Sequence, residues 1–198
     1  MSIERDATFR SARKRLAATL GGRFPPAARS GFSLIELMIT LALLAILTGL
    51  AAPSFGTMIR DTRLATSAND LLATLFLTRS EAVKRGRRVT LCTSVDLAAC
   101  ATNVGWHRGW IMFEDPNSNA LRDGGEEILR VEGARSDAVT ITGTNTMRDY
   151  VSYISSGNTR TANGALQMAT ITICEGDAAR RVVISATGRP RVVVAVGC

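Results

Sequence analysis

One stretch of the sequence carries side-chain oxygens at the spacing of a calcium-binding loop. In such a loop, template positions 1, 3, 5, 9 and 12 supply oxygen ligands to the cation. Those positions are occupied by Asp115, Asn117, Asn119, Asp123 and Glu126. Position 6, where the sharp turn favours glycine, is Ala120, and the flanking residues have the pattern of strands rather than helices. The stretch is therefore either a polar hairpin loop or a weak calcium site, and calcium is the only cofactor that the sequence suggests.

A group of arginines near the C-terminus could bind phosphate. Between Cys174 and Cys198 the chain contains Arg180, Arg181, Arg189 and Arg191. The segment Gly188-Arg189-Pro190-Arg191 is typical of a turn between two strands, and its proline stiffens that turn. Because arginine can bind phosphate oxygens in bidentate fashion, the segment could contact the backbone of double-stranded DNA. A solvated hairpin or a contact between subunits would use the same residues.

Nothing in the sequence indicates a catalytic centre. His107 is the only histidine, it lies between Trp106 and Arg108, and no nucleophile motif surrounds it. We interpret it as a structural side chain and the protein as a non-enzyme. The alternative is a periplasmic enzyme that is held by a membrane anchor.

Four cysteines suggest an oxidising compartment. Three disulfide pairings are possible. We favour Cys92–Cys100, which closes a short loop, and Cys174–Cys198, which ties the C-terminus to a preceding strand. A metal site is the alternative, but the cysteine spacing does not match the paired CxxC pattern and only one histidine is present.

An apolar run near the N-terminus has the length of a membrane helix. No charged residue occurs between Glu36 and Arg60, and residues 32–52 supply about 20 mostly apolar positions, enough to span the hydrocarbon core of a bilayer. The first 31 residues carry seven Lys or Arg against two acidic residues, so they should stay cytoplasmic, with the rest of the chain outside the inner membrane. A cleaved secretory signal ending near Gly49-Leu50-Ala51 is the alternative.

A carboxylate interrupts this apolar segment. An unpaired acid at the edge of a membrane span costs roughly 2.5–3.5 kcal/mol, so Glu36 is expected to have a partner unless it lies at the lipid headgroups. The string Gly31-Phe32-Ser33-Leu34-Ile35-Glu36-Leu37 resembles the processing site of type IV prepilins and pseudopilins. The resemblance implies that a prepilin peptidase cuts after Gly31 and N-methylates Phe32. It also implies that Glu36 neutralises the new amine of a neighbouring subunit during assembly.

The remaining pattern predicts one long helix followed by strands. Apolar residues recur at helical spacing from position 54 to Arg85, and Gly86 is a helix-ending residue. Pro53 lies where a kink is expected. Strands are predicted at Arg87–Ser94, Gly109–Glu114, Glu127–Val131, Ala138–Thr142, Tyr150–Ser155, Ala169–Cys174, Arg181–Ser185 and Arg191–Val196.

Three landmarks in the strand region extend the resemblance. They are Arg88-Val89-Thr90-Leu91-Cys92, Gly109-Trp110-Ile111-Met112-Phe113 and the Gly188–Arg191 turn, and they look like the GspH/FimT group of minor pseudopilins. The resemblance implies an α+β, pilin-like fold in which a long N-terminal helix packs on a C-terminal antiparallel sheet domain. We expect a leader at 1–31, a membrane or filament-core helix at 32–53, an amphipathic helix half at 54–86, and a periplasmic domain at 87–198.

Two functions follow from this resemblance. The first is a minor pseudopilin of a type IV pilus that captures DNA in natural transformation, because FimT-like members carry a GRxR tail motif that Arg189 and Arg191 match. The second is the H-type minor pseudopilin of a type II secretion system. Either way the expected partners are other minor and major pilins or pseudopilins, the prepilin peptidase and the membrane, with double-stranded DNA added in the first case.

Overall fold

The computed structural model describes the backbone of residues 31–198 and every side chain among them except those of residues 50–54. The predicted leader, apart from Gly31, therefore lies outside the described residues. The chain divides into two compact units, Met1–Gly49 and Leu50–Cys198, which are treated separately below.

A single helix, α2, is assigned from Leu34 to Arg85. The side-chain oxygen of Ser33 accepts a hydrogen bond from the backbone N–H of Glu36 at 3.2 Å, so Ser33 caps the first turn. Lys84 and Arg85 lie in the last turn, where positive charge complements the helix dipole. Gly86 follows with a φ of +66°, a left-handed conformation that ends the helix at low steric cost. The helix assignment continues through Pro53, whose side chain is not described.

One face of the C-terminal part of α2 forms the centre of the hydrophobic core. Leu64, Ala68, Leu71, Leu75 and Ala82 recur every three, four or seven residues and are at most 1% exposed. These residues form one cluster with buried side chains from both sheets. The amphipathic pattern of the sequence therefore corresponds to a helix face covered by strands.

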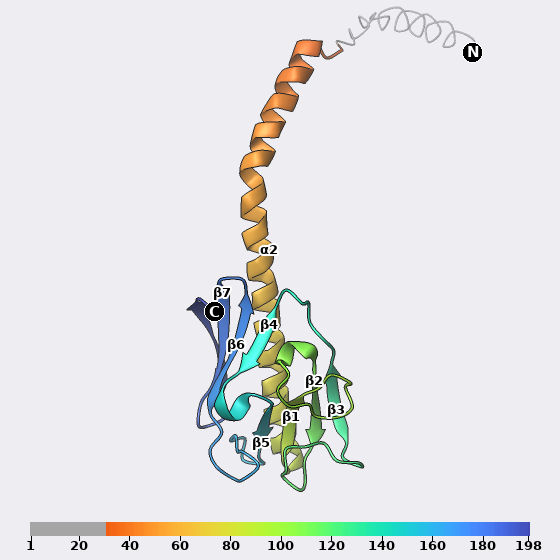
Figure 1. Cartoon of the computed structure of the whole chain (residues 1–198), viewed down its shortest axis with the longest axis vertical. Helices are drawn as coiled ribbons and strands as arrows, with labels where there is room; N and C mark the ends of the chain where they lie inside the picture. The colour runs from red at the N-terminus through yellow and green to blue at the C-terminus, as the bar shows by residue number, and fades with distance from the viewer. Residues whose placement is uncertain (1–30) are drawn as a thin grey trace, which may run out of the picture. The chain divides into compact units, whose positions relative to one another are not determined.

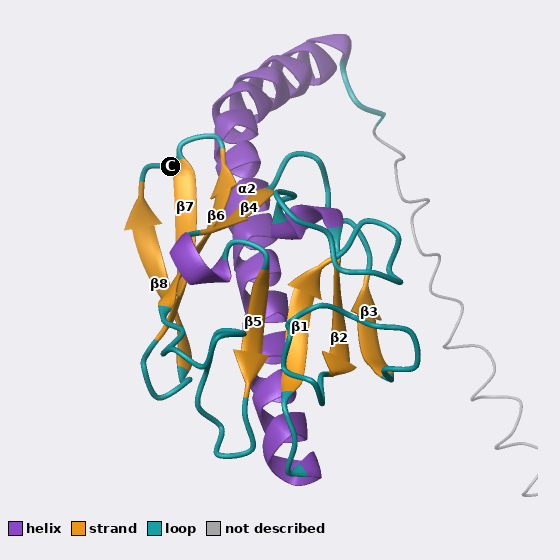
Figure 2. Cartoon of the chain, turned by 60° about the horizontal axis from the view of Figure 1, so that its bottom comes forward, coloured by secondary structure: helices purple, strands orange, loops and turns teal. Residues whose placement is uncertain are grey.

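Eight strands form two antiparallel sheets of four, both seen beside α2 in Figures 1 and 2. The first sheet has the order β3-β2-β1-β5, with bounds β1 Val89–Thr93, β2 Trp110–Glu114, β3 Ile128–Glu132 and β5 Tyr150–Tyr153. The second has the order β4-β6-β7-β8, with bounds β4 Thr140–Gly143, β6 Ala169–Glu175, β7 Ala178–Ile184 and β8 Pro190–Val196. Two short 3-10 helices, η1 Trp106–Arg108 and η2 Asn145–Met147, lie in the connections.

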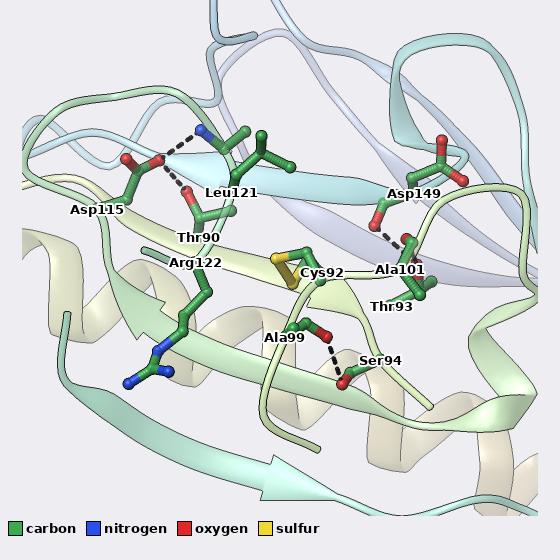
Figure 3. The surroundings of a disulfide bond; sticks show 12 residues. Thr90, Cys92, Thr93, Ser94, Ala99, Ala101, Asp115, Leu121, Arg122 and Asp149 are labelled. Atoms are coloured by element: carbon green, nitrogen blue, oxygen red, sulfur yellow. Dashed lines mark hydrogen bonds between the residues drawn. A yellow bond between two sulfur atoms is a disulfide. The ribbon is translucent and has the colours of Figure 1, made fainter. Parts of the chain in front are cut away.

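Two disulfides close loops in this domain, and they are the two pairings that the sequence analysis favours. Cys92 in β1 bonds to Cys100, and Cys174 in β6 bonds to Cys198 at the C-terminus. The short loop between Cys92 and Cys100 is also held by two hydroxyl groups, drawn in Figure 3. Ser94 Oγ donates to the carbonyl oxygen of Ala99 at 2.6 Å, and Thr93 Oγ1 donates to that of Ala101 at 2.7 Å.

Candidate functional site: an N-terminal assembly segment and a basic turn

The first part of α2 exposes an almost continuous apolar surface. Every described residue from Gly31 to Gly49 is exposed, including Phe32 at 82% and Leu34 at 77%. The hydroxyl of Thr40 donates to the carbonyl of Leu37, and the hydroxyl of Thr48 donates to that of Leu44, both at 2.9 Å. Because these hydroxyls are satisfied within the helix, the surface of this segment is suited to an apolar environment.

The predicted membrane segment 32–53 extends into residues 50–53, whose side chains lie outside the described set, and it stays a prediction. In the portion of the chain that the structure describes, no helix is long and apolar enough to cross a membrane.

Glu36 lies in the first turn of α2, where a negative charge is favourable. Its backbone N–H is bound by Ser33, but its carboxylate has no hydrogen-bond or ion-pair partner among residues 31–198. The side chain is exposed together with the leucines and isoleucines around it. Among the described residues, the helix therefore presents a carboxylate without a partner on an apolar surface, close to the predicted cleavage point between Gly31 and Phe32.

The second candidate site is the arginine-containing segment near the C-terminus, where a tight turn joins β7 to β8. The backbone N–H of Ser185 donates to the carbonyl of Arg189 at 3.2 Å, and that of Gly188 donates to the carbonyl of Ser185 at 2.9 Å. Gly188 has a φ of +72°, which favours glycine, and it is buried. The turn is at the end of the domain where α2 finishes (Figures 1 and 2).

The strand register divides the four predicted arginines. Arg181 is opposite Val193, and Arg191 is opposite Val183, so these two arginines share the sheet face that points away from the buried Val182 and Ile184. Arg180 is opposite Val194 and lies on the other face. Arg189 is in the turn itself.

The arginines at this turn are not neutralised by the domain. None of Arg180, Arg181, Arg189 and Arg191 has a side-chain hydrogen bond or an ion pair with a described residue. Arg181, Arg189 and Arg191 are exposed, whereas Arg180 is half-buried. Three exposed guanidinium groups on the turn and the outer sheet face therefore remain available to an anion.

A second basic cluster, formed by Arg85, Arg87 and Arg88, is used structurally. Arg85 contacts carboxylate oxygens of Glu81 at 2.9 Å, Glu114 at 3.2 Å and Glu127 at 2.9 Å. Hydrogen bonding to Arg85 lowers the pKa of Glu81. Arg87 pairs with Glu114, and Arg88 donates to the carbonyl of Thr161 at 3.2 Å. Arg85 thereby fastens the end of α2 to β2, whereas Arg88 contacts the segment that follows β5.

The loop at 115–126 joins β2 to β3 as a polar hairpin loop, in which most of the candidate oxygen ligands bind other groups of the loop and its neighbours. Asp115 is fully buried, and its carboxylate accepts hydrogen bonds from Thr90 Oγ1 at 2.8 Å and from the backbone of Asn119 and Ala120 at 3.1 Å. The side-chain amides of Asn117 and Asn119 each donate to Asp123 at 2.7 Å. Within residues 31–198, no group of three or more His, Cys, Asp or Glu side chains could hold a metal. The loop therefore uses its oxygens internally.

His107 contributes to the fold. Its Nδ1 accepts a hydrogen bond from the backbone N–H of Ile141 at 3.2 Å, which ties η1 to β4. Its backbone carbonyl accepts from the N–H of Arg135 at 2.8 Å. The role is structural, as the surrounding sequence indicates.

Two regions of the chain match known protein families. Residues 26–52 match the prokaryotic N-terminal methylation motif, and residues 67–188 match the type II transport protein GspH. No curated protein sequence matches the chain.

A solved structure of a type IV minor pilin shows the same fold. The type IV minor pilin FimU of Pseudomonas aeruginosa is 21% identical over 66% of this chain and 92% of its own, with a TM-score of 0.50. The minor pseudopilin EpsH from the type 2 secretion system of Vibrio cholerae is 14% identical over 67% of this chain and 97% of its own, with a TM-score of 0.46. The likeness to FimU confirms the predicted α+β, pilin-like fold. Because the GspH match covers more than half of the chain and the methylation motif precedes it, this protein belongs to the GspH family of pilin-like minor pseudopilins, which are structural subunits and not enzymes.

Proposed function

We propose that this chain assembles through its N-terminal helix into a type IV pilus or pilus-like fibre. The observation that carries the proposal is the carboxylate of Glu36, which has no partner among the described residues and lies on an exposed apolar helix that begins beside Gly31 and Phe32. Membership of a pilin family with the methylation motif implies association with other pilins and with the prepilin peptidase.

Processing and assembly are linked by charge. Removal of residues 1–31 leaves a methylated amine on Phe32, in a segment whose side chains are mostly apolar. When helices pack head to tail, Glu36 of one subunit neutralises the amine of the next, which avoids an unpaired charge in the fibre core. Before assembly the same helix anchors the subunit in the bacterial inner membrane as a single span, with the sheet domain in the periplasm. Pro53 marks the end of the predicted filament-core segment.

The assembly proposal is tested by replacing the carboxylate. We expect Glu36→Gln to lower the amount of this subunit in sheared fibres by about tenfold or more, because an unneutralised buried amine costs at least 1.4 kcal/mol. Glu36→Asp keeps the charge and serves as the matched control. Mass spectrometry of the mature wild-type chain should show a methylated N-terminus at Phe32. Normal incorporation of E36Q, or a mature chain that begins elsewhere, would contradict the proposal.

We further propose that the β7–β8 turn captures double-stranded DNA in natural transformation. Arg181, Arg189 and Arg191 are exposed and have no partner among the described residues, so they can contact phosphates without first breaking an ion pair. Arg180 is excluded because it lies on the other sheet face. Such contacts are independent of base sequence and weaken steeply as salt concentration rises.

The DNA proposal is tested with the full-length chain in a non-ionic detergent and a fluorescent duplex. We expect the double variant Arg189→Gln and Arg191→Gln to bind more weakly and to flatten the slope of log K against log salt by about 1.8, the value for two lost phosphate contacts. Arg108→Gln is the matched control, since Arg108 is exposed and is the last residue of η1, which lies at the opposite end of the first sheet from Tyr153. Unchanged binding by the double variant refutes DNA capture by this turn.

The second candidate function is that of the H-type minor pseudopilin of a type II secretion system. The observation that favours it is the match to the type II transport protein GspH over residues 67–188. In that case the partners are other pseudopilins and exported proteins. A deletion strain separates the two functions: loss of transformation with normal export supports the pilus, whereas loss of export with normal transformation supports secretion.

A further inference from the structure

The β7–β8 turn is docked on the loop that follows β5. A Cβ atom at Gly188 would lie 2.5 Å from the carbonyl oxygen of Gly157 and 3.1 Å from Cε1 of Tyr153. No larger residue fits at this point, so the turn lies directly against the 154–158 segment. This contact fixes the position of Arg189, the next residue in the chain.

Arg79 reaches the same segment from α2. A Cβ atom at Gly157 would lie 3.0 Å from Nε of Arg79 and 3.4 Å from its Nη2. Burial raises the pKa of Tyr153, and the positive charge of Arg79 acts in the opposite direction, as expected for a guanidinium near the phenol. Gly157 contacts Arg79 on one side and Gly188 of the turn on the other, so the guanidinium of Arg79 lies close to the turn that carries Arg189.

Arg79 has no neutralising partner in the described part of the chain. It makes no side-chain hydrogen bond or ion pair there, although it is half-buried. Glu81, which is close in sequence, contacts Lys84 and Arg85 instead. Arg79 thus differs from Arg85, which is held by three carboxylates. Like the exposed arginines of the turn and the outer sheet face, it has no ion-pair partner among the described residues.

We propose that Arg79 is a further phosphate-contacting residue and that the DNA-binding surface continues from the outer face of β7 and β8, across the turn, to the end of α2. This inference rests on the proposed DNA capture and names an additional part of the same surface. The ligand is the phosphate backbone of a duplex, because the surface offers guanidinium groups from α2, β7, β8 and the turn, none of which has a partner among the described residues.

The test uses the full-length chain in non-ionic detergent with a fluorescent duplex of mixed sequence, titrated between 50 and 200 mM salt. We expect Arg79→Gln to weaken binding and to flatten the salt slope by about 0.9, one phosphate contact. Arg79→Lys keeps the charge and should retain the wild-type slope, and Arg108→Gln should change neither quantity. Thermal unfolding of each variant establishes that the fold is kept.

The outcomes distinguish this inference from the function on which it rests. If R79Q binds as the wild type does while the Arg189/Arg191 double variant loses binding, the role of Arg79 is overturned and DNA capture by the turn stands. If R79K flattens the slope as much as R79Q, charge is not the cause and the inference also fails. If no arginine variant alters binding, the proposed DNA capture itself is refuted.

Discussion

Arg85 and Arg189 have the same side chain but differ in their ion-pair partners. Arg85 is held by carboxylate oxygens of Glu81, Glu114 and Glu127, and these contacts raise its pKa further above an already high value. Arg189 is exposed and has no such partner among residues 31–198. The sequence distinguishes the two only weakly, because the acids that neutralise Arg85 are up to 42 residues away. At the scale of single residues, the pairing and not the residue type separates structural cations from those available to a ligand.

Glu126 supports a prediction about pH. Burial, and then the charges of Asp115 and Asp123, raise its pKa above the ordinary value of 4.5, and its Oε1 is buried without a partner. Because the folded state holds this proton more tightly, Glu126 destabilises the fold increasingly as the pH rises through and above its ordinary pKa. We expect Glu126→Gln to raise the free energy of unfolding at pH 7 and to have much less effect at pH 4.

Urea unfolding at the two pH values measures this difference. The glutamine can still accept the hydrogen bond that the N–H of Asp123 donates to Glu126 at 2.9 Å, so the loop should keep its conformation. An equal effect at both pH values would show that the change acts through packing and not through ionisation.

At the scale of elements, the disulfide between Cys174 and Cys198 connects two strands that are not neighbours. Cys174 lies in β6 and Cys198 follows β8, with β7 between them. β8 is an edge strand that pairs only with β7, and it carries Arg191. The disulfide therefore secures the end of the strand on which the proposed phosphate-binding surface depends.

The two disulfides should differ in their contribution to stability. Their sequence separations are 24 and 8 residues, and the loop-entropy relation gives about 3.5 kcal/mol for the longer and about 2.6 kcal/mol for the shorter. We expect the double variant of Cys174 and Cys198 to alanine to lower the unfolding free energy by roughly that larger amount and also to weaken DNA binding. Urea unfolding and the duplex titration measure the two effects. A destabilised variant with wild-type DNA affinity would show that the end of β8 is not needed for binding.

Local sequence patterns predicted the elements well and their assembly less well. Each of the eight predicted strands overlaps an observed one. However, β7 begins three residues earlier than predicted, at Ala178, because its first part is short in β-branched residues. The end of the helix at Arg85 followed from Gly86. The separation into two sheets depends on β5 returning to pair with β1, a long-range contact that no local pattern encodes. The proximity of Arg79 to the β7–β8 turn is also a long-range contact, so the sequence pattern could not predict it.

At the scale of the whole molecule, the chain divides at Gly49 into a segment suited to assembly and a domain with its own core. Among the described residues, the main core cluster begins at Leu64 and draws on α2 and both sheets. The apolar side chains from Phe32 to Leu47 take no part in that cluster. The two parts can therefore be tested independently.

We expect a chain that begins at Leu50 to fold as the full-length protein does. Its melting temperature should lie within about 3 °C of that of the full chain in detergent, which for a domain of this size corresponds to roughly 1 kcal/mol. Calorimetry measures this quantity, and gel filtration should show a soluble monomer. A broad or absent transition would mean that residues before Leu50 contribute to the core.

The covalent link between β6 and the C-terminus also has a mechanical consequence. Under the proposed function, a pull on bound DNA would enter the domain at the β7–β8 turn and pass back along the chain toward α2. Without the link, 15 residues separate Arg189 from Cys174; with it, a parallel route of nine residues runs from Arg189 to Cys198 and across the sulfurs. At about 3.5 Å per residue, the strands can be drawn out by roughly 30 Å instead of 50 Å before covalent bonds bear the load. On that proposal, the covalent link limits how far a pulling force can peel the edge strand β8 away.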